Sequence, residues 1–168
     1  LKAAAIVETS LPPTRQHLMT ERLLALAIYN QDLFSLLGSD LSPNWLAAGL
    51  GQELYRRLLV YYTERKQLAL EELKLELANE PKLVSLLERL WIKADNDFGD
   101  FTSEQQQTEM ATLLQALKNN YLTSELKLVA ESVRQAENKG DQAELTKLLE
   151  NFNDLSKELS NQRNHAQD

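Results

Sequence analysis

The stretch Asp95-Asn96-Asp97-Phe98-Gly99-Asp100 comes closest of any part of the sequence to a metal-binding loop. Calcium prefers oxygen ligands, and an EF-hand loop places Gly at its sixth position and a bidentate Glu at its twelfth. In this sequence those two positions are Asp100 and Gln106. We therefore interpret 94–101 as a solvated acidic loop and not as a calcium site.

The other motifs that suggest chemistry are incomplete. Gly49-Leu50-Gly51 lacks the third Gly and the preceding strand of a dinucleotide-binding fingerprint, and the sequence has no Gly-Lys-Ser/Thr phosphate loop. We interpret the two glycines as a kink where helices cross closely. His17 has no Cys or nucleophile near it in the sequence, so it is predicted to be a surface or partly packed histidine.

Metal and cofactor sites are not predicted. The chain has no Cys, and its two His residues, His17 and His165, are far too distant in sequence to form a ligand pair on one helix. Trp45 and Trp91 lie on helical apolar patterns and are interpreted as core anchors rather than stacking platforms for bases. Because the net charge is −7 and no basic stripe is present, we expect no direct nucleic-acid binding. We expect this chain to have no catalytic residues, no metal and no cofactor.

The composition predicts an all-α protein. Leu occurs 35 times, Ile and Val together 8 times, Gly 5 times and Pro 4 times in 168 residues. Leu favours helices, whereas β-branched residues favour sheets. No apolar run approaches the roughly 20 residues of a membrane span, so we expect a cytoplasmic protein without a membrane partner. The first residue is Leu and not Met, from which we expect a piece of a longer protein.

Apolar spacing and capping residues predict the helices of the first two thirds. They are a helix over Arg15–Tyr29, a short second one ended by Gly38, a third opened by Ser42-Pro43, and two more over 68–78 and 81–93. Gly49 and Gly51 interrupt the third helix, so that a separate turn can precede a restart near Gly51.

A long helix is predicted from the capping box of Thr102 and Gln105 to Gly140. Its apolar stripe changes face by about 110° near Tyr121, at 100° per residue. The first stripe is Met110, Leu114, Leu117 and Tyr121, and the second is Leu122, Leu126, Val129, Val133 and Ala136. The final helix has matching spacing at Leu145, Leu148, Phe152, Leu155 and Leu159. It is predicted to pair with the second stripe as an antiparallel hairpin.

This pattern divides the chain into four parts. We predict a linker tail over 1–13, a helical bundle over 14–120, a helical hairpin over 121–161 and a frayed tail over 162–168. A lone hairpin has one seam to bury, so it gains stability by docking on a partner.

The order of the segments resembles the C-terminal, helicase-interacting domain of bacterial DnaG-type primases, over about 18–161. The stretches that carry the resemblance are Glu21 to Ala27 with Asp32-Leu33-Phe34; Gly49 to Leu58; Leu87 to Trp91; Leu113, Leu117, Glu125 and Leu126 of the long helix; and Leu155 to Leu159. One departure is Gln31, where many members have Pro before the second helix.

The resemblance implies a bundle followed by a hairpin, and a zinc-binding domain and catalytic core upstream. The implied function is to dock the primase on the hexameric DnaB-type replicative helicase during primer synthesis, and this chain would itself be no enzyme. The hairpin would supply binding and the bundle would modulate the helicase. The matching docking positions are Leu148, Leu149, Phe152, Leu155, Lys157 and Leu159.

Several alternatives stay open from the sequence. Leu145, Leu148, Phe152, Leu155 and Leu159 are equally compatible with an internal seam and with docking. Leu149 and Leu128 lie off the seam and are better docking candidates, and Lys157 and Asn161 are predicted to tune affinity from the rim. Other possible functions are the N-terminal collar domain of a replicative helicase and a generic helical adaptor. We expect a monomer, with a hairpin-swapped dimer as the alternative.

Overall fold

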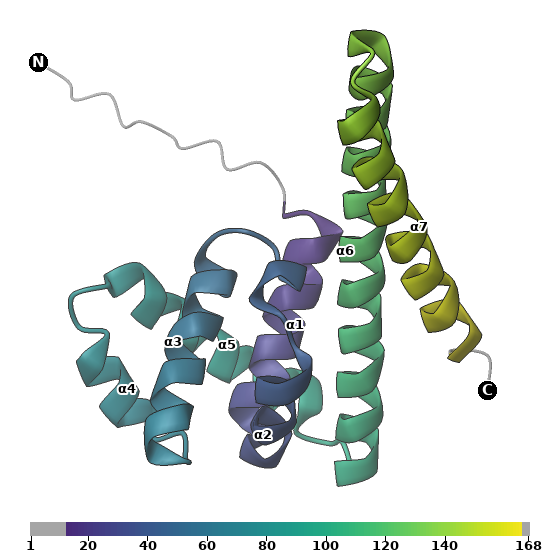
Figure 1. The fold of residues 1–168 in the computed structure, drawn as a ribbon. Coiled ribbons are helices and arrows are strands. Elements are labelled where there is room, and N and C mark those ends of the chain that lie inside the picture. Colours follow the sequence, from purple (N-terminus) through teal and green to yellow (C-terminus); the bar gives the residue numbers. More distant parts are fainter. Residues whose placement is uncertain (1–12, 166–168) are drawn as a thin grey trace, which may run out of the picture.

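The computed structural model describes residues 13–165, apart from the side chains of residues 36 and 163–165 (Figure 1). Within that range the chain is all-α, as predicted, with seven α-helices, one 3-10 helix and no strand. The elements are α1 (Arg15–Tyr29), α2 (Gln31–Asp40), η1 (Pro43–Trp45), α3 (Leu50–Arg65), α4 (Leu70–Glu76), α5 (Pro81–Phe98), α6 (Ser103–Lys139) and α7 (Gln142–His165). The predicted linker tail lies outside the described residues except for Pro13.

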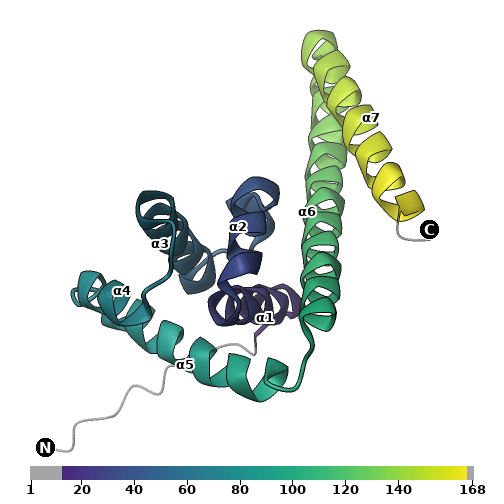
Figure 2. The ribbon, with the colours of Figure 1, turned by 90° about the horizontal axis from the view of Figure 1, so that it is seen from below.

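Helix α1 is the centre of the bundle. All residues from Leu23 to Ile28 are buried, so this part of the helix is enclosed on every side rather than along one stripe. It packs against α5 and α6 and also contacts α2 and α3, as Figure 2 shows from below. The remaining core side chains come from α2 to α5 and from the first part of α6.

The break between α1 and α2 forms at Asn30 without a proline. The Asn30 side chain accepts a hydrogen bond from the Asp32 N–H (3.1 Å) and so begins α2. Gln31 instead holds the loop before α4, because its amide donates to the Leu68 carbonyl (2.8 Å) and accepts from the Leu68 N–H (3.2 Å). Gln31 therefore has a structural role in this chain.

The interrupted third helix is confirmed. Residues 43–45 form η1, and α3 begins after Gly49, which has a φ of 124° that L residues rarely adopt. Gly51 lies where α3 crosses α1, and a Cβ at this position would lie 2.9 Å from the Thr20 methyl group. The close crossing is confirmed for Gly51, whereas Gly49 has no atom within 4 Å of the position of a Cβ and is set apart by its backbone conformation.

Two helix ends predicted in the bundle are wrong. Helix α5 does not end at Lys93 but continues to Phe98, because Ala94 and Phe98 extend its buried stripe. The acidic stretch from Asp95 is therefore largely helical and not a loop. Helix α2 continues through Gly38 to Asp40, and the Leu41 N–H still donates to the Leu37 carbonyl (2.9 Å).

Helices α6 and α7 form the predicted hairpin, which extends beyond the bundle in Figure 1. The capping box of Thr102 and Gln105 is confirmed, and Gly140 ends α6 in the left-handed conformation. Residues 162–165, predicted to be frayed, are helical, and the Gln162 carbonyl accepts a hydrogen bond from Gln115 of α6; residues 166–168 lie outside the described part. None of the helices in the described range has an apolar stretch that would carry it across a lipid bilayer.

Candidate docking surface on the helical hairpin

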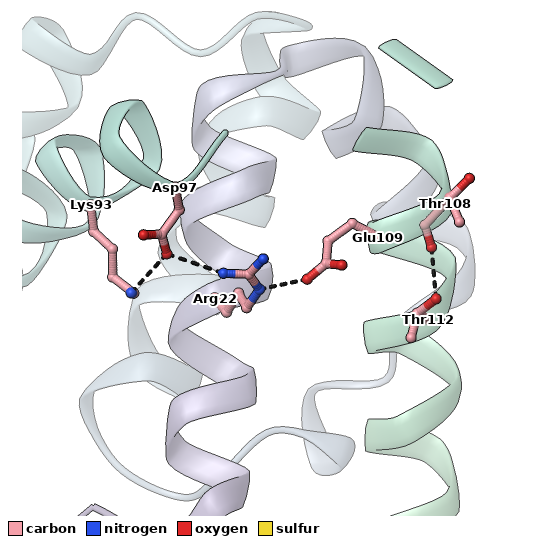
Figure 3. A network of polar contacts seen from close by, with 6 residues as sticks. All are labelled: Arg22, Lys93, Asp97, Thr108, Glu109 and Thr112. Atoms are coloured by element: carbon pink, nitrogen blue, oxygen red, sulfur yellow. Dashed lines mark hydrogen bonds and ion pairs between the residues drawn. The ribbon is translucent and has the colours of Figure 1, made fainter. Parts of the chain in front are cut away.

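The first part of α6 is fixed to the bundle by an ion-pair network around Arg22 (Figure 3). The Arg22 Nη1 atom lies 3.2 Å from Asp97 Oδ2 of α5, and its Nε atom lies 2.5 Å from Glu109 Oε1 of α6. Lys93 also pairs with Asp97 (2.8 Å), and the guanidinium of Arg22 lies 4.7 Å from the ring centre of Phe98. One side chain of α1 thus joins α5 to α6.

Further contacts extend this attachment along α6. Asn30 donates to the Gln106 side chain (2.8 Å), and three apolar residues of α6, Met110, Leu113 and Leu117, are buried in the bundle core. Because α6 is one continuous helix from Ser103 to Lys139, its orientation on the bundle also sets the direction of the hairpin.

The root of the hairpin is polar. The Lys118 ammonium lies 5.3 Å from the ring centre of Trp45 in η1 and pairs with Glu158 of α7 (2.9 Å). Gln115 donates to the Gln162 carbonyl (3.1 Å). Asn119 Oδ1 is buried and accepts no hydrogen bond from the described residues. The α7 helix is therefore held at its C-terminal end by contacts that are partly open to solvent.

The seam of the hairpin is apolar but incompletely buried. On α6, Leu122, Val129 and Ala136 are buried, whereas on α7 only Leu159 is buried. The other predicted seam residues of α7 are half-buried: Leu145, Leu148, Phe152 and Leu155. The structure places all of these residues between the two helices, and it leaves part of each α7 side chain accessible to a partner.

The two candidates predicted to lie off the seam are exposed. Leu128 on α6 is 61% exposed and Leu149 on α7 is 45% exposed. Lys157 and Asn161 are also exposed on α7. Burying large apolar side chains such as Leu128 and Leu149 in an interface is favourable, by about 1.5–3 kcal/mol for a side chain that becomes fully buried.

The bundle carries apolar surface that sequence reasoning missed. Trp91, interpreted from the sequence as a core anchor, is 43% exposed and packs against the Tyr29 ring at 6.1 Å between centres, and its neighbour Ile92 is 63% exposed. With Leu70 and Leu87 they line an open groove of about 390 Å³ between α4 and α5. No local pattern distinguishes the exposed pair Trp91-Ile92 from the adjacent pair Leu86-Leu87 of the same helix, which is buried. Trp45 is half-buried against the core, as a partial anchor.

Two polar side chains of the bundle, Tyr55 and His17, form hydrogen bonds to neighbouring groups of the fold. Burial raises the pKa of Tyr55 to about 12, and its hydroxyl donates to the carbonyls of Leu37 and Leu41 at the end of α2. His17 is exposed and bonded to Thr14, as predicted for a surface histidine. Within residues 13–165 no three His, Cys, Asp or Glu side chains are arranged to hold a metal ion.

No protein-family model, curated protein or solved structure matches the chain. The functional argument therefore depends on the residues and on the geometry described above.

Proposed function

We propose that this chain is the helicase-docking domain of a bacterial DnaG-type primase. In this proposal the α6–α7 hairpin binds the DnaB-type hexameric replicative helicase, and other parts of the primase carry out primer synthesis. The observation that carries the proposal is the hairpin itself, which extends from the bundle and leaves Leu128 and Leu149 exposed on either helix. The order of segments that resembles the primase family supports it.

The arrangement suits a tethering function. The core cluster of the bundle is formed by residues from Leu23 to Leu117, so the bundle does not depend on the hairpin for its apolar interior. The hairpin buries few side chains of its own, and a partner that covers the half-buried α7 residues would add to its stability. Binding and ordering of the hairpin would thus be coupled.

The charge distribution favours a protein partner over nucleic acid. Several basic side chains of the bundle are already in ion pairs, among them Arg22, Arg57, Arg65, Lys74 and Arg89. A phosphate backbone is bound by clustered, available Lys and Arg side chains that release counterions. A net charge of −7 and the pairing of these basic side chains both disfavour a phosphate backbone as the partner of the bundle.

The proposal is tested by co-migration of the purified chain with the hexameric replicative helicase of the same organism in size-exclusion chromatography. The whole chain should co-elute with the hexamer, and a chain that ends at Tyr121 should not. Circular dichroism must show that the shortened bundle still melts cooperatively. Absence of binding by the whole chain would refute helicase docking, whereas full binding by the shortened chain would place the site on the bundle.

A further inference from the structure

The hairpin has two different sides, which can be assigned from contacts at its root. Leu128 follows Leu117 by eleven residues, which is about three helical turns, so both lie on the same side of α6. Leu117 is buried in the bundle core, and Leu128 therefore faces the side on which the bundle lies. Leu149 precedes Glu158 by nine residues, which is about two and a half turns, so the two lie on opposite sides of α7.

Glu158 lies on the side of the bundle, because it pairs with Lys118, whose ammonium lies over the Trp45 ring of η1. Leu149 therefore faces away from the bundle. We call the side with Leu128 the near face and the side with Leu149 the far face. The two exposed leucines of the hairpin cannot both lie at the centre of one flat interface.

The near face carries carboxylates beside its apolar residues. Glu125 precedes Leu128 by three residues, Glu144 precedes Leu148 by four, and Glu158 follows Leu155 by three, so each carboxylate lies one turn from an apolar neighbour. An interface centred on Leu128 would have to remove these charges from water. Desolvation of carboxylates is costly, even for Glu158, which is paired with Lys118, and the centres of protein interfaces are depleted of charged residues.

The far face has an uncharged centre. It is formed by six residues, all half-buried or exposed: Thr123, Leu126 and Ala130 of α6 and Leu149, Asn153 and Ser156 of α7. Half of them are small, namely Thr123, Ala130 and Ser156, which allows the backbone of a partner helix to approach closely. Three basic side chains surround this centre, each one turn after a member of the face: Lys127 after Thr123, Arg134 after Ala130 and Lys157 after Asn153. One exposed carboxylate, that of Glu137, also lies on this side, because it follows Leu128 by nine residues, and it is close to the Gly140 turn.

Lys127, Arg134 and Lys157 are exposed and form no ion pair with any described residue. They give the far face a basic rim on a chain whose net charge is −7. A second copy of the chain is a poor occupant, because a symmetric contact through the same patch would bring one basic rim against the other. The complementary partner is a helical surface with an apolar, uncharged centre and carboxylates at its edge.

We infer that the hairpin binds such a partner through the far face, with Leu149 at the centre and the three basic side chains at the rim. This inference rests on the proposed function, in which the partner is the replicative helicase, and it adds which side of the hairpin is used and what chemistry the helicase must present. In this inference Lys157 keeps the rim role that the sequence predicts for it, and Leu128 does not take part.

The experiment compares two matched variants of the whole chain, Leu149→Gln on the far face and Leu128→Gln on the near face. Each is titrated against the purified hexameric helicase, and circular dichroism checks that helix content is unchanged. We expect Leu149→Gln to weaken binding by about tenfold or more and Leu128→Gln to change it by less than about twofold.

A second pair of variants tests the rim. Lys157→Glu lies on the far face, whereas Lys147→Glu lies eleven residues before Glu158 and therefore on the near face; both side chains are exposed. Lys157→Glu should lower the association rate by about three- to tenfold and reduce its dependence on salt, because rim charges act mainly on encounter. Lys147→Glu should leave the rate within about twofold.

The inference is overturned if Leu128→Gln weakens binding as much as Leu149→Gln, or if neither does while the chain ending at Tyr121 fails to bind. Each of those results would leave helicase docking by the hairpin intact. Failure of the parent chain to bind at all would instead refute the proposed function. Equal effects of Lys147→Glu and Lys157→Glu on the association rate would show that the basic side chains of the far face do not contact the partner.

Discussion

The bundle and the hairpin are built from similar leucine-rich helices, but they bury their apolar residues to very different extents. In the bundle, α1 alone buries every residue from Leu23 to Ile28. In the hairpin, Leu122, Val129 and Ala136 on α6 and Leu159 on α7 are the buried apolar residues. The comparison indicates that the bundle supplies stability, whereas the hairpin exposes surface that a partner can cover.

The largest expected effect is on the bundle core. Phe34 is fully buried, and its ring lies 5.1 Å from that of Tyr62 and 6.4 Å from that of Tyr55. Phe34→Ala should lower the free energy of unfolding by about 3–5 kcal/mol, because it leaves a cavity in a packed interior. Thermal denaturation measures the loss. The control is Leu75→Ala, which is 77% exposed and should change stability by less than about 0.5 kcal/mol.

A smaller and more local effect is expected in the hairpin seam. Leu148→Asp places a carboxylate against α6 and should melt the hairpin, at a cost of about 2–3 kcal/mol, while the bundle keeps its cooperative transition. Circular dichroism should therefore show a partial loss of helix. The neighbouring Leu149→Asp is the matched control and should keep full helix content. Complete unfolding by Leu148→Asp would show that the two regions are not independent.

The Arg22 network tests the connection between the two regions. Arg22→Met removes the ion pairs with Asp97 and Glu109. The side chains of all three residues are about one quarter to one third exposed. Solvent screening limits the loss of stability to about 1 kcal/mol. Hydrogen exchange should become faster in the first turns of α6 and not in α4. Arg56→Met, which removes a 3.9 Å exposed pair with Glu53, is the control and should have no measurable effect.

The smallest expected effect is a gain in stability at the hairpin root. Asn119 Oδ1 is buried and has no hydrogen-bond partner among the described residues. Asn119→Leu removes this unsatisfied acceptor and should raise the free energy of hairpin opening by about 0.5–1 kcal/mol, measured by hydrogen exchange of α7. Faster exchange in the variant would mean that the Asn119 amide stabilises the hairpin root.

Features set by neighbouring residues could be predicted from the sequence. The ends of α6 follow from Thr102, Gln105 and Gly140, and the change of stripe near Tyr121 predicts the hairpin. The extension of α5 was missed because Asp95 and Asp97 are typical of loops, although Ala94 and Phe98 continue the apolar spacing. Burial of that stripe outweighs the low helix propensity of Asp.

Features set by residues distant in sequence could not be predicted. Arg22 with Glu109, Gln31 with Leu68, and Lys118 with Glu158 leave no local pattern, because each pair forms only when the helices are packed. For the candidate site, the sequence identified Leu128 and Leu149 as off the seam. It did not assign them to opposite sides of the hairpin, since that depends on where the bundle lies relative to α6.

Hydrogen exchange of the whole chain, alone and in the presence of the hexameric replicative helicase, tests the central claim most directly. The measurement reports separately on the bundle and the hairpin within one sample. Docking by the hairpin predicts slower exchange in α7 and in α6 beyond Tyr121, with the amides of α1 to α5 unchanged. Slower exchange confined to the bundle, with α7 unaffected, would contradict the account.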